Sequence, residues 1–116
     1  MSHPVSAFFG VAHGVANSIL LPTVLRYNAL ADTGRYQSIY RCITGKSPVD
    51  FRSEMLVEFI YKLMQKLELP TALSQVGVTE NAIPSMAADA MKSGNIQVNP
   101  RQSTQADIER LYRLAL

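Results

Sequence analysis

The sequence predicts an all-α protein. Apolar residues recur at three- and four-residue spacing in several segments, no segment shows the sustained alternation typical of a β-strand, and glycines and prolines separate the periodic segments. The chain has 116 residues, of which 47% are hydrophobic and 17% are charged, as in an ordinary globular domain. We therefore expect one compact multi-helix bundle of about five to six helices.

Two helices are expected before residue 46. The first begins near His13 and Gly14 and runs toward Tyr27, with a kink at Pro22 because proline has no backbone N–H. The second spans about residues 34–43 and ends at Gly45. The apolar residues expected on one face of this second helix are Tyr36, Ile39, Tyr40 and Ile43.

A strong helix-start signal precedes the third helix. Ser47 can cap it, Pro48 fits its first turn, and Asp50 complements the positive end of the helix dipole. An apolar stripe follows and is expected to face the core. It consists of Met55, Leu56, Phe59, Ile60, Leu63, Met64 and Leu67.

The rest of the chain predicts a helical turn and two more helices. The turn follows residues 69–71 and ends at Gly77, and the next helix spans about residues 81–93, before Gly94. Residues 99–101 form an extended break.

The last helix is expected to begin at Thr104, with Asp107 as the second half of a pair that resembles a capping box. Its inward residues are expected to be Ile108, Leu111, Tyr112 and Ala115.

Charge and hydropathy exclude several classes of function. The net charge is +2 and no predicted helix carries a cluster of Lys or Arg, which argues against a nucleic-acid partner and against a helix-turn-helix DNA-binding protein. The longest apolar stretches, such as residues 15–21, fall far short of the ~20 residues that cross a bilayer, so no membrane partner is expected. We see no signal peptide, and Cys42 has no cysteine to pair with, which indicates a reducing cytoplasm. We expect Cys42 to be a buried structural thiol.

The two histidines are the candidate chemical residues, and both lie within residues 1–17. A histidine that precedes a glycine at a helix start, as His13 does, can direct one ring nitrogen at a metal while a backbone group orients the other. His3 and His13 alone, with no Asp, Glu or Cys nearby, do not complete a metal site. Ordinary polar or packing roles therefore remain the alternative to ligation.

Several motifs carry a resemblance to a known family. Residues 1–4 (Met-Ser-His-Pro), residues 10–17 (Gly-Val-Ala-His-Gly-Val-Ala-Asn) and residues 20–22 (Leu-Leu-Pro) resemble the signature of iron-containing alcohol dehydrogenases. The downstream segments that resemble the family's C-terminal order are Arg26-Tyr27-Asn28, residues 69–78, Asn99-Pro100-Arg101 and residues 104–116. The departures are Thr23, where the family often has His, and Gln102, where Pro often follows. The resemblance covers the whole chain and implies a helical domain of the dehydroquinate-synthase-like type.

The resemblance also implies roles for both histidines. In that family a Rossmann-like N-terminal domain binds NAD or NADP, and the helical domain holds a divalent metal that acts as a Lewis acid in hydride transfer. One Asp and three His ligate this metal, and only the last of them, His13, falls within this sequence. His3 matches a histidine that lines the active-site cleft near the nicotinamide. The alternative for His3 is an exposed position near a frayed N-terminus.

We expect the chain to be a truncated C-terminal domain without a nucleotide-binding domain. Because it has one metal ligand of four and no glycine-rich phosphate loop, we expect it to be inactive alone and to bind neither iron (or zinc) nor NAD(P) tightly. Its expected partner is the missing nucleotide-binding domain. The competing hypothesis is a stand-alone helical module for protein interaction, with a homodimer covering apolar surface around Phe8 and Phe9. These two residues could instead line a substrate pocket.

Overall fold

The computed structural model describes all 116 residues and is all-α, as predicted. It has seven α-helices rather than five or six, joined by short loops and three turns of 3₁₀ helix. The α-helices are α1 (Ser2–Phe9), α2 (His13–Asn28), α3 (Arg35–Thr44), α4 (Ser53–Lys66), α5 (Ile83–Ala90), α6 (Gly94–Gln97) and α7 (Gln105–Leu114), and the 3₁₀ turns are η1 (Ala29–Ala31), η2 (Leu73–Val76) and η3 (Glu80–Ala82). None of the helices is both long enough and apolar enough to span a membrane.

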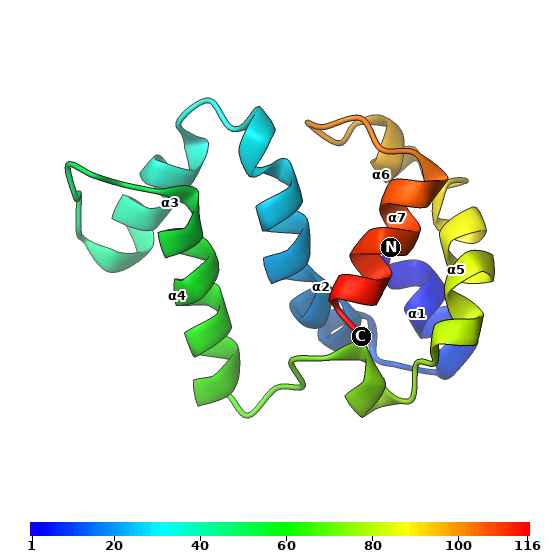
Figure 1. Cartoon of the computed structure of the whole chain (residues 1–116). Helices are drawn as coiled ribbons and strands as arrows, with labels where there is room; N and C mark the ends of the chain where they lie inside the picture. The colour runs from blue at the N-terminus through cyan, green and yellow to red at the C-terminus, as the bar shows by residue number, and fades with distance from the viewer.

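Helix α2 divides the molecule into two lobes (Figure 1). The larger lobe contains α1, α5, α6 and α7, and the smaller lobe contains α3 and α4. Helix α2 packs against α1 and α7 on one side and against α4 on the other. Both lobes therefore share α2 as a common wall, and Pro22 lies within this helix, which continues past it.

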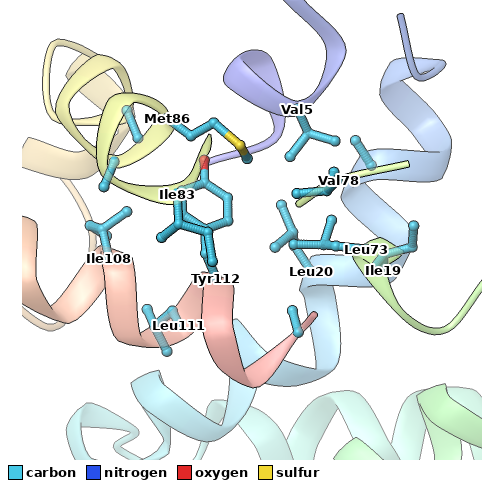
Figure 2. Close-up of a cluster of buried hydrophobic side chains, with 14 of the residues drawn as sticks. Val5, Ile19, Leu20, Leu73, Val78, Ile83, Met86, Ile108, Leu111 and Tyr112 are labelled. Atoms are coloured by element: carbon cyan, nitrogen blue, oxygen red, sulfur yellow. The ribbon is translucent and has the colours of Figure 1, made fainter. Parts of the chain in front are cut away.

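The core of the larger lobe is one cluster of fifteen buried apolar residues, most of which Figure 2 shows. Tyr112 lies in the middle of this cluster, with its ring fully buried and its hydroxyl directed away from α7. The cluster consists of Val5, Ala16, Ile19, Leu20, Tyr27, Leu73, Val78, Ile83, Met86, Ala87, Ala90, Ile108, Leu111, Tyr112 and Ala115. The smaller lobe has separate buried residues: Tyr36, Leu56, Val57 and Met64.

The two ends of the chain meet in the larger lobe. The hydroxyl of Tyr112 donates a hydrogen bond to the backbone carbonyl of Met1, with 2.6 Å between the oxygens. Just after the end of α7, the backbone N–H of Leu73 donates to the carbonyl of Ala115 at 2.7 Å. Burial raises the pKa of Tyr112 well above its ordinary value, so the phenol stays protonated and keeps its donor.

The start of α7 confirms the predicted capping box. The side chain of Thr104 accepts a hydrogen bond from the backbone N–H of Asp107 at 3.2 Å, and the carboxylate of Asp107 accepts from the backbone N–H of Thr104 at 3.0 Å. All four predicted inward residues of α7 are buried. The predicted ends at Gly45 and Gly77 are also confirmed, because both glycines adopt positive φ, at 69° and 87°.

One helix was missed, and two predictions about helix ends were wrong. Helix α1 was not expected, and it ends where Gly10 adopts a φ of 66° and its N–H bonds to the carbonyl of Ser6. The third helix begins at Ser53 instead of Ser47, because Arg52 is extended and its carbonyl receives the first helical hydrogen bond. Gly94 opens α6 instead of ending α5, since the side chain of Ser93 caps the N–H of Asn95.

The face of α4 also differs from the prediction. Leu56 and Met64 of the predicted stripe are buried, as is Val57, which was not predicted. Leu63 and Leu67 are 41% and 59% exposed, because α4 packs chiefly against α2 and α3, which leaves these two side chains largely uncovered. On α3, Tyr36 is buried but Ile39 and Ile43 are about half exposed for the same reason.

Cys42 was expected to be buried, and the structure shows it to be exposed. It lies on α3, which belongs to the smaller lobe and packs chiefly against α4. The apolar neighbours in sequence that suggested burial are themselves exposed, as Ile43 is.

Replacing Tyr112 with phenylalanine tests the link between the chain ends. The variant leaves the buried carbonyl of Met1 without its donor, so we expect the free energy of unfolding to fall by about 1 to 3 kcal/mol in urea denaturation followed by circular dichroism. Tyr61→Phe is the matched control, because the Tyr61 hydroxyl makes no hydrogen bond and is on the exposed side of α4. Equal stabilities of the two variants would contradict this role of Tyr112.

The pH dependence of stability tests the cap of α7. The hydrogen bond from the backbone N–H of Thr104, and then that from its hydroxyl, lowers the pKa of Asp107. Because the folded-state pKa is the lower one, the stabilisation is fully present above the unfolded-state pKa of about 3.9 and is lost as the pH falls through the folded-state pKa. We expect the stability difference between wild type and Asp107→Asn to shrink steadily below about pH 4. A difference that stays constant down to acid pH would contradict this assignment.

Candidate functional site

The structure brings the two histidines together. His3 lies in the first turn of α1, and His13 is the first residue of α2, across the short connection that Gly10 begins. Their ring centroids are 4.6 Å apart, with 50° between the ring planes, and both side chains are exposed. His3 therefore lies in a helix, at an exposed position.

Two imidazoles do not make a complete metal centre. No three side chains among the His, Cys, Asp and Glu residues of this chain come together in a way that could hold a metal ion. Protein metal sites that bind tightly use three or four such ligands, often with a carboxylate among them. The exposed pair can supply one or two ligands.

A pocket of about 400 Å³ adjoins this pair, and His3 forms part of its wall. We call it the His3 pocket. Its lining contains imidazole, amide, hydroxyl and apolar groups but no Lys, Arg, Asp or Glu side chain. The lining residues are Met1, Ser2, His3, Asn17, Ser18, Leu20, Leu21, Val24, Tyr27, Asn95, Ile96, Asn99, Ser103, Ile108 and Leu111.

Neither Phe8 nor Phe9 lines the His3 pocket. Phe8 lies on the surface and is 50% exposed, whereas Phe9 is partly buried and packs against the main core. No role was predicted for Asn95 and Ser103, because neither residue type indicates a site on its own. The fold brings both residues into the lining of the pocket that also contains His3.

A set of polar contacts between the end of α2 and residues 99–103 closes one side of this pocket. We call it the α2 clasp. The Arg101 guanidinium stacks on the Tyr27 ring at 3.9 Å and donates to the Tyr27 carbonyl at 3.0 Å. The Tyr27 hydroxyl in turn donates to the Gln102 carbonyl at 2.8 Å.

The clasp also contains a reciprocal pair of amides. Each of Asn28 and Asn99 donates a hydrogen bond to the other's side-chain oxygen at 2.9 Å. The sequence segments involved, residues 26–28 and 99–101, were singled out by resemblance, but no contact between them was predicted. Their function in the structure is to fix the loop that carries Asn99 and Ser103 against α2.

The sequence matches known proteins along its whole length. The model of the C-terminal part of the Fe-containing alcohol dehydrogenase family matches residues 1–116. Lactaldehyde reductase of Escherichia coli K12 is 39% identical over 119 aligned residues, which cover 99% of this chain and 31% of that protein. 1,3-Propanediol dehydrogenase of Klebsiella pneumoniae is 35% identical, with 99% and 30% covered. The chain thus spans about a third of the length of the relatives that it matches.

The fold agrees as well. A crystal structure of 1,3-propanediol oxidoreductase superposes with a TM-score of 0.92 at 31% identity, covering 99% of this chain and 31% of that one. An alcohol dehydrogenase from Oenococcus oeni superposes with a TM-score of 0.83 at 28% identity. With the family model matching along its whole length, the chain belongs to the Fe-containing alcohol dehydrogenase family and corresponds to its C-terminal domain.

Proposed function

We propose that these residues form the helical domain of a metal-dependent NAD(P) alcohol dehydrogenase, which transfers hydride between an alcohol or aldehyde and the nicotinamide. The observation that carries the proposal is the pairing of His3 and His13 beside a pocket, on a fold that the family shares. In this proposal His13 supplies one ligand of a metal site that residues outside this chain complete. The metal, when bound, polarises the oxygen of the alcohol or aldehyde.

His3 takes a different role in the proposal. His3 lines the pocket, whereas His13 does not. His3 can therefore reach an alcohol bound there and hold or accept its proton. Its side chain is exposed, which leaves room for a substrate and for a nicotinamide supplied by another domain.

The lining of the His3 pocket favours small neutral substrates. Amide and hydroxyl groups of Asn17, Asn95 and Ser103 can pair with substrate hydroxyls, and no Lys or Arg side chain lines the pocket to pair with a carboxylate or phosphate. The names of two relatives, lactaldehyde reductase and 1,3-propanediol dehydrogenase, refer to molecules of this kind. We therefore propose short diols and hydroxyaldehydes as the substrate class.

In this proposal the 116 residues do not catalyse the reaction alone. The chain supplies two exposed imidazoles where a metal needs more ligands, and the sequence offers no glycine-rich loop for a dinucleotide.

A chimera tests these assignments. Residues 1–116 are joined to the preceding two-thirds of Escherichia coli lactaldehyde reductase, and metal content and NAD-dependent oxidation of propane-1,2-diol are measured. We expect activity in the chimera and none in the 116-residue chain. His13→Ala should weaken metal binding by more than about tenfold, whereas His3→Ala should keep the metal and lower kcat by about a hundredfold.

The two histidine variants are matched controls for each other. Full metal content in His13→Ala would show that His13 is no ligand, and loss of metal from His3→Ala would show that the two roles are assigned the wrong way round. Turnover by the 116-residue chain alone would contradict the need for residues outside it.

The exposed edge of α4 favours a second candidate function, self-association. Leu63 and Leu67 lie one turn apart on the same face and are both substantially exposed, and such apolar surface tends to find a partner. In this alternative the chain forms a homodimer through α4. Sedimentation velocity should then show a dimer that Leu67→Lys disrupts and Leu30→Lys, at a more exposed site outside α4, leaves intact. A monomer at all concentrations would exclude it.

A further inference from the structure

A second pocket, of about 250 Å³, lies between α2 and α7 and shares Tyr27 and Leu111 with the His3 pocket. Three of its seven lining residues are arginines, and no Asp or Glu lines it. We call it the arginine pocket. Its lining consists of Thr23, Arg26, Tyr27, Arg101, Arg110, Leu111 and Leu114.

The three arginines differ in how far their charge is already neutralised. Arg26 forms a bidentate ion pair with Glu54, with the shortest contact at 2.6 Å, and this pairing raises the pKa of Arg26. The negative charge of Glu58 also raises the pKa of Arg26. Arg26 is therefore committed to the smaller lobe and contributes little to an incoming anion.

Arg101 is held in place with most of its donors unused. Its guanidinium is fixed over the Tyr27 ring, and one N–H is bonded to the Tyr27 carbonyl. Arginine has five N–H donors in a rigid plane, so four remain for a ligand. A donor that is already fixed loses less conformational entropy when it binds.

Arg110 makes no hydrogen bond and no ion pair, and its side chain is exposed at the rim of the pocket. The acidic group that acts on both Arg101 and Arg110 is Asp107, and the same carboxylate oxygen accepts both hydrogen bonds from Thr104. Two guanidinium groups therefore face one carboxylate, which leaves a net positive charge in a recess.

We propose that the arginine pocket binds a small anion, a carboxylate or phosphate group that carries a short apolar portion. Arg101 and Arg110 bind the anionic oxygens, and Thr23 supplies a hydroxyl. Leu111 and Leu114 contact the apolar portion. At ~30 Å³ per water, the pocket has room for about eight waters, which is enough for an oxyanion and a few carbons.

This site is distinct from the one proposed for alcohols. The His3 pocket contains no charged side chain, whereas the arginine pocket contains three, so the two pockets select ligands of different charge. Binding at the arginine pocket requires neither a metal nor a nucleotide, and it is independent of the proposed dehydrogenase activity.

Titrations of the purified 116-residue chain test the proposal. Inorganic phosphate, butyrate and the neutral analogue 1-butanol are each added, and binding is followed by calorimetry and by amide chemical shifts in ¹⁵N NMR. We expect phosphate and butyrate to shift amides around Thr23, Arg101 and Arg110, with weaker binding as ionic strength rises. We expect 1-butanol to leave these amides unshifted.

Two variants locate the site. Arg110→Gln should weaken anion binding by about tenfold, because it removes charge-assisted hydrogen bonds while breaking no contact within the fold. Arg41→Gln is the matched control, since Arg41 is also an exposed arginine and lies on α3, outside the pocket. Leu114→Ser should weaken butyrate but not phosphate, which separates the apolar contact from the ionic one.

The possible results are decisive. Binding of phosphate without butyrate, lost in Arg110→Gln, supports the anion site and restricts its ligand to phosphate groups. Equal binding of butyrate and 1-butanol, unchanged affinity in Arg110→Gln, or an equal loss in Arg41→Gln would each overturn the proposal.

Discussion

The hydrogen bond from Tyr112 to the Met1 carbonyl holds the rest of the larger lobe in register. A buried phenol is costly without a partner, and the partner here is the backbone at the start of the chain. The contact ties the residue that precedes α1 to α7, while α1 itself packs against α2 and α5. Because Met1, Ser2 and His3 also form one wall of the His3 pocket, the same bond that satisfies the core sets the position of the candidate chemical residue.

Helix α2 positions the rest of the His3 pocket wall. Its first residue is His13, its middle residues Asn17 and Leu20 face the pocket, and its last turn holds the α2 clasp. The clasp uses a stacked cation, two tyrosine-mediated hydrogen bonds and an amide pair to fix residues 99–103, which have no regular structure of their own. One helix thereby positions both histidine-bearing and amide-bearing parts of the site.

The sequence predicted correctly the elements whose structure depends on residues close together in the chain. Helix α7 was predicted correctly because its capping box and apolar face both lie within twelve residues of sequence, and Gly45 and Gly77 ended helical turns because only glycine adopts positive φ without strain. Helix α1 was missed because no capping side chain marks its start and because its own sequence does not reveal that it packs against α2 and α5. The exposure of Leu63 and Cys42 could not be predicted either, since an apolar periodicity does not reveal whether a partner covers that face.

The candidate site follows the same division. Motifs identified His3 and His13 individually, but nothing in their spacing placed the rings 4.6 Å apart, because that distance depends on the turn at Gly10 and the crossing of α1 on α2. The arginine pocket could not be predicted from the sequence, because Arg26, Arg101 and Arg110 are far apart in the chain. The α2 clasp brings Arg26 and Arg101 to the same pocket. Tyr27 and Leu111 separate a neutral pocket from a cationic one, and Arg101 rests on that boundary. The stacking of Arg101 on Tyr27 thus holds a residue of the His3 pocket wall and also fixes the charge of Arg101 in the arginine pocket. A substitution of Arg101 is therefore expected to alter both pockets.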